Sequence, residues 1–329
     1  MSETAFDVLG IGNAIVDVIA ETTDAFIAEQ SLDKGIMRLI DEAEAARLYD
    51  AMGPGIEVSG GSAANTIAGV AALSGRASFI GRVRDDELGD VFAHDIRAQG
   101  VSFKSAQAKD GPLTAHCLVL VTPDAQRTMN TYLGACIHLA RSDVDTDAIA
   151  ASRAIYLEGY LWDAPEGPAI FAAAAEAAAR AGREVAMTLS DPFCVDRHRE
   201  DFLAFIRNHV DILFANEIEI ASLYEVDAFD EAARRVSDDV KIAALTRSEK
   251  GSVIVAGSGR TVVSAISTRV VDTTGAGDLY AAGFLYGYAT GASLERAGRI
   301  GSVCAGEIIS HIGARPRANL RTLIAEQLG

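Results

Sequence analysis

An aspartate that directly follows a glycine turn is the residue of this chain best suited to chemistry. It closes a stretch that reads Asp272, Thr273, Thr274, Gly275, Ala276, Gly277 and Asp278. β-Branched residues before the turn and an alanine-rich apolar segment after it predict a strand, a tight turn and the start of a helix. Gly275 and Gly277 let a bulky anion reach the backbone, and the free N–H groups of a first helical turn favour negative charge. Asp278 does not suit a simple anion site, but phosphoryl transfer needs a base beside the phosphate.

A glycine turn whose aspartate interacts with the helix dipole is the structural alternative. The whole stretch, however, resembles the second signature of the ribokinase-like (PfkB) carbohydrate and nucleoside kinases, Asp-Thr-x-Gly-Ala-Gly-Asp. The resemblance implies that Asp278 takes the proton of an acceptor hydroxyl. It implies a K⁺ ion near Asp272 and Thr274, where backbone carbonyls could bind it. It also implies that amides up to Asp278 hold the charge of the transferred group, in a turn made of Gly275, Ala276 and Gly277.

A second glycine pair, Gly60 and Gly61, precedes a predicted helix, and a purely structural helix start with Ser62 as its N-cap is an alternative that can hold at the same time. Such a pair before a helix start again lets a ligand approach the backbone. The segment resembles the first signature of the same family. This resemblance implies that Gly60, Gly61 and Asn65 lie against the sugar.

The first predicted strand ends in Gly10 and Gly12, which on their own would suggest a dinucleotide loop. Ile15 stands where the third glycine of that loop should be, and strand-like residues follow instead of a helix, which counts against a nucleotide dehydrogenase. The stretch resembles the start of adenosine kinases, Gly-x-Gly-Asn-x-x-x-Asp. By that resemblance Asn13 and Asp17 would hydrogen-bond the vicinal hydroxyls of a ribose. A turn asparagine and a surface aspartate are the alternative.

Segments 114–122 and 127–133 flank a turn signal and predict a β-hairpin. Together with the strands expected early in the chain, this hairpin predicts a small β-sheet lid that stands off the main domain. We expect the lid to be formed by insertions at approximately 14–40 and 103–135.

Two residues are matched to the acceptor and phosphate site through adenosine kinases, and a third, Met37, is a candidate by its residue type alone. Arg127 matches a lid arginine that meets the transferring phosphates, with a solvated hairpin arginine as the alternative. Met37 could offer an apolar contact to a bound base or simply pack in the lid. Tyr160 aligns with an aromatic residue that stacks on adenine, and its alternative is a boundary tyrosine with a hydrated hydroxyl.

Two stretches are matched to the nucleotide and its metal. Asn216 and Glu219 follow a predicted strand and resemble the family's Asn-x-x-Glu motif, which organises Mg²⁺ and phosphate, often through water. Thr246 and Gly251 belong to a stretch like the family's Thr-x-Gly-x-x-Gly nucleotide loop, although Ser248 replaces the middle glycine. Gly277 is expected to contact ATP as well.

From residue 142 onward, helical stretches alternate with short apolar strands, expected at 154–157, 184–189, 210–214 and 242–245. This alternation predicts a mostly parallel sheet covered on both faces, with ligands at the carboxyl ends of its strands. Combined with the resemblance, it implies one ribokinase-like α/β domain over residues 1–329. The expected architecture is a three-layer α/β/α sandwich with an inserted β-sheet lid.

The composition limits the partners. The 329 residues are 49 % hydrophobic, enough for a large core, and the net charge of −17 argues against a nucleic-acid partner. The four cysteines form no C-x-x-C pair, so we expect reduced thiols. No leader-like start or membrane-length apolar run is present in the sequence, so we expect a cytoplasmic protein without a membrane partner, as a monomer or homodimer.

The implied reaction is transfer of the ATP γ-phosphate, with Mg²⁺, to the 5′-hydroxyl of adenosine or a similar ribonucleoside. Within the family the alternative is a sugar kinase that acts on ribose, fructose or a ketodeoxy acid. Outside catalysis the alternative is a nucleoside sensor, against which Asp278 counts because a sensor needs no base.

Overall fold

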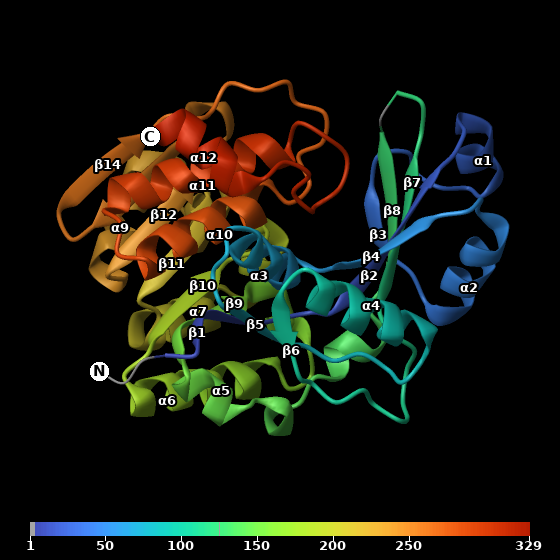
Figure 1. The fold of residues 1–329 in the computed structure, drawn as a ribbon, viewed down its shortest axis with the longest axis horizontal. Helices are drawn as coiled ribbons and strands as arrows, with labels where there is room; N and C mark the ends of the chain where they lie inside the picture. The colour runs from blue at the N-terminus through green and yellow to red at the C-terminus, as the bar shows by residue number, and fades with distance from the viewer. Residues whose placement is uncertain (1–3, 125) are drawn as a thin grey trace.

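The computed structural model describes residues 4–124 and 126–329, and within them two β-sheets organise the chain (Figure 1). All pairings from β12 to β6 in the larger sheet are parallel. Two antiparallel strands, β13 and β14, extend its other edge. In spatial order the strands are β14 (Gly259–Val263), β13 (Ser252–Ala256), β12 (Ile242–Thr246), β11 (Ile212–Asn216), β10 (Glu184–Thr188), β9 (Ser152–Glu158), β1 (Phe6–Ile11), β5 (Ala77–Ile80) and β6 (Val101–Phe103).

Both faces of this sheet are buried, because successive side chains of a strand point to opposite sides. In β1, Val8 packs into the core on one face and Leu9 into the core on the other. In β9, Tyr156 and Ile155 divide in the same way. The near-continuous apolar strands are therefore those of a parallel sheet with two covered faces. The expected three-layer arrangement is confirmed.

Helices form the two outer layers, and Figure 1 shows α10, α11 and α12 on the opposite side of the sheet from α5 and α6. One layer contains α3 (Ser62–Ala72), α4 (Glu87–Ala98), α10 (Ala276–Ala289), α11 (Leu294–Ile308) and α12 (Leu320–Leu328). The other contains α5 (Thr146–Ala150), α6 (Gly167–Ala181), α7 (Pro192–His209), α8 (Glu217–Tyr224) and α9 (Phe229–Asp239). Short 3₁₀ turns are η1 (Gly134–His138), η2 (Arg141–Asp143), η3 (Gly159–Asp163) and η4 (Ser248–Lys250).

The second sheet stands to one side of these layers and forms the lid (Figure 1). Its strands, in spatial order, are β3 (Met37–Leu39), β8 (Arg127–Tyr132), β7 (His116–Val121), β2 (Ile15–Glu21) and β4 (Ile56–Gly60). The helices α1 (Asp24–Glu29) and α2 (Glu42–Ala51) lie beside its outer face. Val16 and Val18 of β2 belong to the large core, whereas Ile15 and Ile19 point to the other face and pack with β7 residues.

The boundaries of the lid differ from the sequence expectation of 14–40 and 103–135. The first segment extends to Gly60, because β4 pairs antiparallel with β2 and places Gly60 opposite Ile15. Strand β4 is short and ends in glycines, so it has too few alternating residues to be recognised as a strand. The second segment begins at β7, since residues 104–115 only connect it to β6 of the large sheet.

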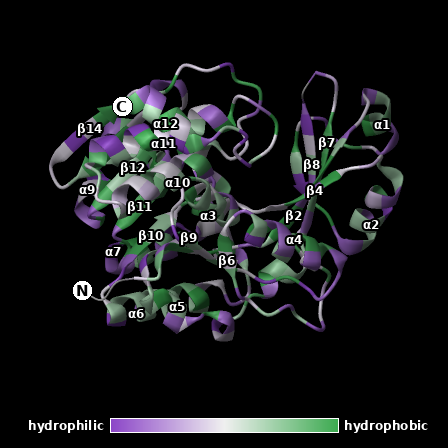
Figure 2. Ribbon diagram, in the orientation of Figure 1, coloured by the Kyte–Doolittle hydropathy of each residue, from purple (hydrophilic) through white to green (hydrophobic). Residues whose placement is uncertain are grey.

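The helices carry mixed hydropathy, as amphipathic covering layers should. Figure 2 shows hydrophobic and hydrophilic residues side by side on α5, α6 and α11. Within residues 4–124 and 126–329, no helix combines the length and apolar character needed to cross a membrane.

Candidate active site

Asp278 lies in the first turn of α10, which begins after the glycine turn as expected. The prediction of a strand before this turn is wrong, because residues 264–275 lie outside any strand of the structure. Gly275 is the N-cap residue with a φ of 77°, a left-handed conformation that favours glycine. Among the described residues, no atom apart from its chain neighbours and its own helix backbone lies within 4 Å of where a Cβ of Gly277 would be, so this backbone is open to a ligand. Asp278 Oδ1 accepts a hydrogen bond from Ser62 Oγ at 2.7 Å, and Oδ2 accepts one from Asn65 Nδ2 at 2.9 Å. The helix start thus presents a carboxylate beside the open backbone of Gly277, while the Ala276 N–H donates to the Thr273 backbone oxygen at 3.2 Å.

Ser62 does not act as the N-cap of α3, contrary to the sequence prediction. The N-cap is Gly61, whose φ of 99° requires glycine, and Ser62 is the first helical residue. Its hydroxyl donates to Asp278 instead. A side chain on Gly61 would strike the backbone oxygen of Asn13, and one on Gly60 would lie 2.5 Å from Asp17 Oδ2. The space beside both glycines is therefore taken by the protein's own atoms.

Glu158, which sequence analysis did not single out, lies at the end of β9 and is buried. Its Oε1 accepts from Asn13 Nδ2 at 2.9 Å and its Oε2 from the backbone N–H of Ala63 at 2.8 Å. Burial raises the pKa of Glu158 to about 7, against the lowering effect of these hydrogen bonds. Its position at the carboxyl end of a central strand was the available signal, because ligands collect at that edge.

Arg315 is the second residue that sequence analysis missed. It lies in the loop after α11, and its Nη2 donates to the backbone oxygen of Ser59 at 2.5 Å. Its Nη1 donates to Asn65 Oδ1. A single arginine in a loop carries no recognisable motif, so only the tertiary structure reveals this position.

Arg127 reaches from the lid to the main domain and forms an ion pair with Asp272. The two side chains are only 10 % and 5 % exposed, which excludes the solvated hairpin arginine. Asp272 also accepts from the backbone N–H groups of Thr274 and Gly313, each at 3.0 Å. The Asp272 side chain is thus fully engaged, and a K⁺ site made of backbone carbonyls near it stays a prediction.

Asp17 is half-buried on the inner face of the lid, between charged groups from both parts of the molecule. Burial raises its pKa to about 6, while the positive charges of Arg315 and Arg127 oppose that rise. Burial likewise raises the pKa of Asp278, against the hydrogen bonds from Ser62 and Asn65.

Three buried polar atoms of this group have no hydrogen-bond partner within the described residues. They are Asn13 Oδ1, Arg127 Nε and Arg315 Nε. Buried polar groups are normally paired, so one acceptor and two donors remain for a bound molecule. The acceptor suits a hydroxyl, and the donors suit anionic oxygen.

Asn216 and Glu219 form a capping box at the start of α8. Asn216 Oδ1 accepts from the N–H groups of Ile218 and Glu219, and Glu219 Oε2 accepts from the Asn216 N–H at 2.9 Å. Burial, together with the charges of Asp191 and Asp278, raises the pKa of Glu219 to about 7. The motif therefore caps the start of α8, and the Glu219 carboxyl group also lies close enough to Asp191 and Asp278 to interact with their negative charges.

Thr246 and Gly251 bracket η4, between β12 and β13. Gly251 has a φ of 84°, and a Cβ there would strike the backbone oxygen of Val263 on β14. The fold therefore requires glycine at this position whether or not the residue contacts a nucleotide. Ser248 adopts a φ of 50°, the left-handed conformation that the replaced family glycine would adopt easily.

Neither Tyr160 nor Met37 shares a hydrogen bond with the Asp278 group within the described residues, although the negative charges of Glu158 and Glu219 act on the Tyr160 hydroxyl. Tyr160 sits in η3, packs partly against the core beneath α6 and α7, and approaches the Ser190 backbone oxygen at 3.5 Å through its hydroxyl. Burial raises the pKa of Tyr160. Met37 is 48 % exposed on β3, at the edge of the lid.

The inner face of the lid is mainly apolar. Residues that share this face in the strand register include Ile15, Ile19, Val58, Val119, Met129 and Met37. Ile312, from the loop that carries Arg315, packs against this group. A flat apolar ligand could lie against this surface while Asp17 offers it a polar contact.

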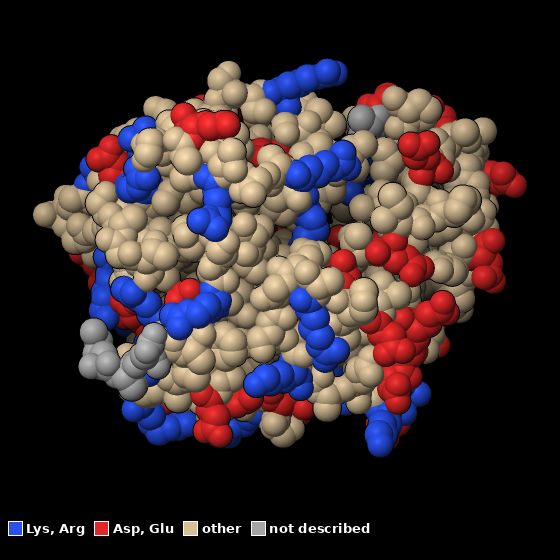
Figure 3. Space-filling model, in the orientation of Figure 1, with Lys and Arg blue, Asp and Glu red and all other residues tan. Residues whose placement is uncertain are grey.

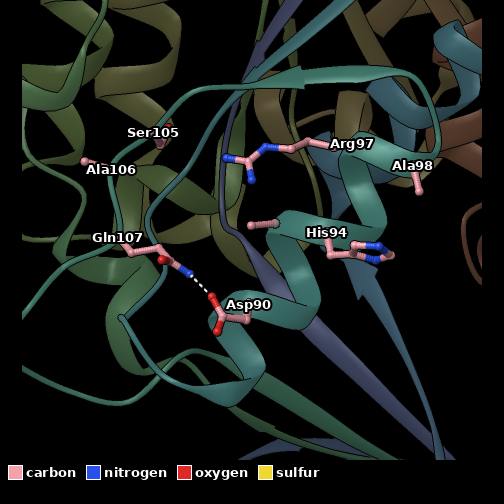
Figure 4. Close-up of a pocket in the computed structure, with 8 residues that line it drawn as sticks. Asp90, His94, Arg97, Ala98, Ser105, Ala106 and Gln107 are labelled. Carbon is pink, nitrogen blue, oxygen red and sulfur yellow. Dashed lines mark hydrogen bonds between the residues drawn. The ribbon is translucent and has the colours of Figure 1, made fainter.

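Surface charge is unevenly distributed. Figure 3 shows acidic side chains gathered over the lid and more Lys and Arg over the main domain on this face. A separate groove between α4 and the loop after β6 is lined by Asp90, His94, Arg97 and Gln107, with Gln107 Nε2 donating to Asp90 at 2.8 Å (Figure 4). None of these four belongs to the Asp278 group.

The chain has close relatives among kinases. The family model described as pfkB family carbohydrate kinase matches residues 55–320. A probable sugar kinase from Rhizobium etli is 51 % identical with a TM-score of 0.91, and 98 % of each chain is covered. An adenosine kinase from Sinorhizobium meliloti is 52 % identical with a TM-score of 0.90, covering 99 % of this chain and 100 % of that one. The adenosine kinase of Saccharomyces cerevisiae is 26 % identical, with 92 % and 94 % covered.

Proposed function

The chain belongs to the pfkB family of carbohydrate kinases, and we propose that it transfers the γ-phosphoryl group of ATP to the 5′-hydroxyl of adenosine. The observation that carries this proposal is the placement of Asp278. Its carboxylate is held at a helix start by Ser62 and Asn65, beside the open backbone of Gly277 and beneath an apolar lid face. The 52 % identical relative named an adenosine kinase supports the choice of acceptor.

In this mechanism the acceptor hydroxyl lies against Asp278, which takes its proton as the phosphoryl group is transferred. The backbone N–H groups from Ala276 to Asp278 would stabilise charge on the transferred oxygens, and the Ala276 N–H would leave the Thr273 backbone oxygen to do so. Asn13 Oδ1, which has no partner among the described residues, would accept from a ribose hydroxyl. Asp17 would accept from the neighbouring hydroxyl. The apolar lid face would cover the base and exclude water.

Arg127 would change partners during the reaction. Its guanidinium pairs with Asp272 in the structure, and its Nε has no partner among the described residues. A phosphate arriving at the glycine turn would offer a stronger anionic partner than one shared carboxylate. The lid arginine would then stabilise the charge that develops during transfer.

Glu219 fits the role of a magnesium carboxylate. Its pKa is raised to about 7 by burial and by the charges of Asp191 and Asp278, so a nearby cation would relieve an unfavourable negative charge. Mg²⁺ needs only one or two protein carboxylates beside water and phosphate oxygens. When bound with ATP, the ion would neutralise charge on the phosphates.

A sugar kinase is the second candidate function. The observation in its favour is Glu158, a buried carboxyl group that accepts from Asn13 Nδ2 and from the Ala63 N–H, and would thereby hold the Asn13 amide oriented toward sugar hydroxyls. The 51 % identical relative from Rhizobium etli named a probable sugar kinase agrees with it.

One screen separates these functions. ADP release is measured with ATP and Mg²⁺ against adenosine, guanosine, inosine, ribose and fructose. Faster turnover with adenosine than with any other acceptor supports the proposal, whereas faster turnover with ribose or fructose selects the sugar kinase. Binding of adenosine without ADP release would identify a non-catalytic nucleoside sensor.

A further inference from the structure

A chain of hydrogen bonds connects Arg315 to the proposed base, and the mechanism above does not use it. Arg315 Nη1 donates to Asn65 Oδ1, and Asn65 Nδ2 donates to Asp278 Oδ2 at 2.9 Å. Arg315 comes from the loop after α11, Asn65 from α3 and Asp278 from α10. Three separate elements therefore meet through one side-chain amide.

The guanidinium determines which way this amide points. Arginine has N–H donors and no acceptor, so the Asn65 oxygen must face Arg315. The Asn65 nitrogen must then face Asp278 as a donor. The reversed amide would set N–H groups against Arg315 and an oxygen against the Asp278 carboxylate, and both contacts would be repulsive.

The fixed amide favours the ionised form of Asp278. Ser62 cannot do this alone, because a hydroxyl can turn and either donate or accept. The Asn65 N–H can only donate, so it stabilises an accepting carboxylate oxygen. A residue that removes a proton from a hydroxyl has to be ionised first.

Arg315 is itself held in position by a second set of contacts. Its Nη2 donates to the Ser59 backbone oxygen at 2.5 Å and to Ser59 Oγ at 3.1 Å. The Ser59 hydroxyl donates to Asp95 of α4 at 2.6 Å, so its lone pairs are free to accept from Arg315. The guanidinium is therefore anchored independently of Asp278.

We propose that Arg315 is a positioning residue that orients the Asn65 amide and thereby keeps Asp278 ionised and aligned for proton abstraction. This inference rests on the proposed function, since it assigns a task to the same site. The loop that carries Arg315 also supplies Ile312 to the lid face and the Gly313 N–H to Asp272.

The charges around Asp278 give the sign of the effect. The negative groups that interact with Asp278 are Asp17 of β2, Glu158 of β9 and Glu219 of α8. The Tyr156 hydroxyl of β9 also interacts with the Asp278 charge. Arg315 is the positive group that lowers the pKa of Asp278 against its burial. Loss of Arg315 should therefore raise the pKa of Asp278.

The test is a ¹³C NMR titration of aspartate carboxyl groups in the full-length protein, with the Asp278 signal identified by its loss in Asp278→Asn. Arg315→Met removes both the donors and the charge. We expect the pKa of Asp278 to rise by about one unit, a tenfold change in proton affinity. The matched control is Arg317→Met on the same loop, whose exposed side chain donates to the Ile312 backbone oxygen. It should leave the titration unchanged.

Turnover provides a second readout with whichever acceptor the screen identifies. In Arg315→Met the fall of kcat on the acid side of its pH profile should move to higher pH. At pH values above this fall, kcat should largely recover the value of the unaltered protein. A merely structural role would lower kcat equally at all pH values. If Arg315→Met does not fold, Arg315→Gln replaces it, and an upward shift is still required because the charge is lost.

An unchanged Asp278 titration in a folded Arg315 variant would overturn the proposal. This outcome is independent of the acceptor, because the titration needs no turnover. Failure of the proposed function would instead appear as absent ADP release from adenosine with the NMR shift intact.

Discussion

Arg127 of the lid and Asp272 of the main domain form a buried ion pair that joins the two parts of the molecule. Asp272 opens the glycine turn that ends in Asp278, so this contact connects the lid directly to the proposed phosphoryl-transfer site. A charge pair with little exposure depends strongly on both partners, because removing one leaves the other buried and unpaired.

We expect Arg127→Ala to reduce turnover while acceptor affinity stays nearly intact, because the arginine would act on the transferring phosphates. Measurement of kcat and KM for both substrates checks this. The control is Arg47→Ala, an exposed arginine on lid helix α2 that contacts Gln30. Turnover equal to that of the unaltered protein would show that Arg127 only joins lid and domain.

Asp278→Asn should lower turnover by roughly 10²–10⁴-fold, the loss typical of removing a general base. The new oxygen can face the Asn65 donor and the new amide can face the Ser62 hydroxyl, so the fold should survive. ATP affinity should hold or tighten, because a negative charge near the phosphates is removed. Turnover, Tm and ATP affinity are compared side by side; near-normal turnover in the folded variant would refute the base assignment.

Tyr160→Ala should weaken adenosine far more than a free sugar, since base stacking contributes about 1–3 kcal/mol. Tyr160 also packs against the core, so the variant should be somewhat less stable. Tyr160→Phe is the matched control, because it keeps the ring and loses only the hydroxyl contact with Ser190. Equal weakening of adenosine and ribose in Tyr160→Ala would count against stacking.

The free energy of unfolding should fall as pH rises from about 5 to about 8. Burial raises the pKa of Glu158 and of Glu219 to about 7, so the folded protein holds protons that the unfolded chain has released. The stabilisation that comes from protonated Glu158 and Glu219 is therefore present at low pH and is lost as pH rises through 7.

Urea unfolding at several pH values measures the slope of the free energy of unfolding against pH. Glu158→Gln should make it shallower, whereas Glu176→Gln, at an exposed position on α6, should leave it unchanged. The same slope in the Glu158 variant as in the unaltered protein would contradict the assignment.

The sequence was sufficient for features that depend on neighbouring residues. The glycine turn before Asp278 predicts a turn and a helix start because backbone freedom and helix initiation are local properties, and both are present. The strand that the β-branched residues before the turn also predict is absent, because strand formation needs a neighbouring strand to pair with. Apolar strands alternating with helices predict the layered parallel sheet for the same reason. The hairpin at Arg127 was also recognisable, since a turn signal lies between two strand-like runs.

The tertiary structure alone decided which distant residues complete the site. Arg315 and Asn65 are 250 positions apart, and Asn13 and Glu158 are 145 apart, so no local pattern connects them. Ser62 was misread as an N-cap because its local signal is the same whether its hydroxyl caps the helix or binds Asp278. Local sequence determined the elements and their order, and packing of those elements determined which polar groups met, because hydrogen bonds depend on position in space.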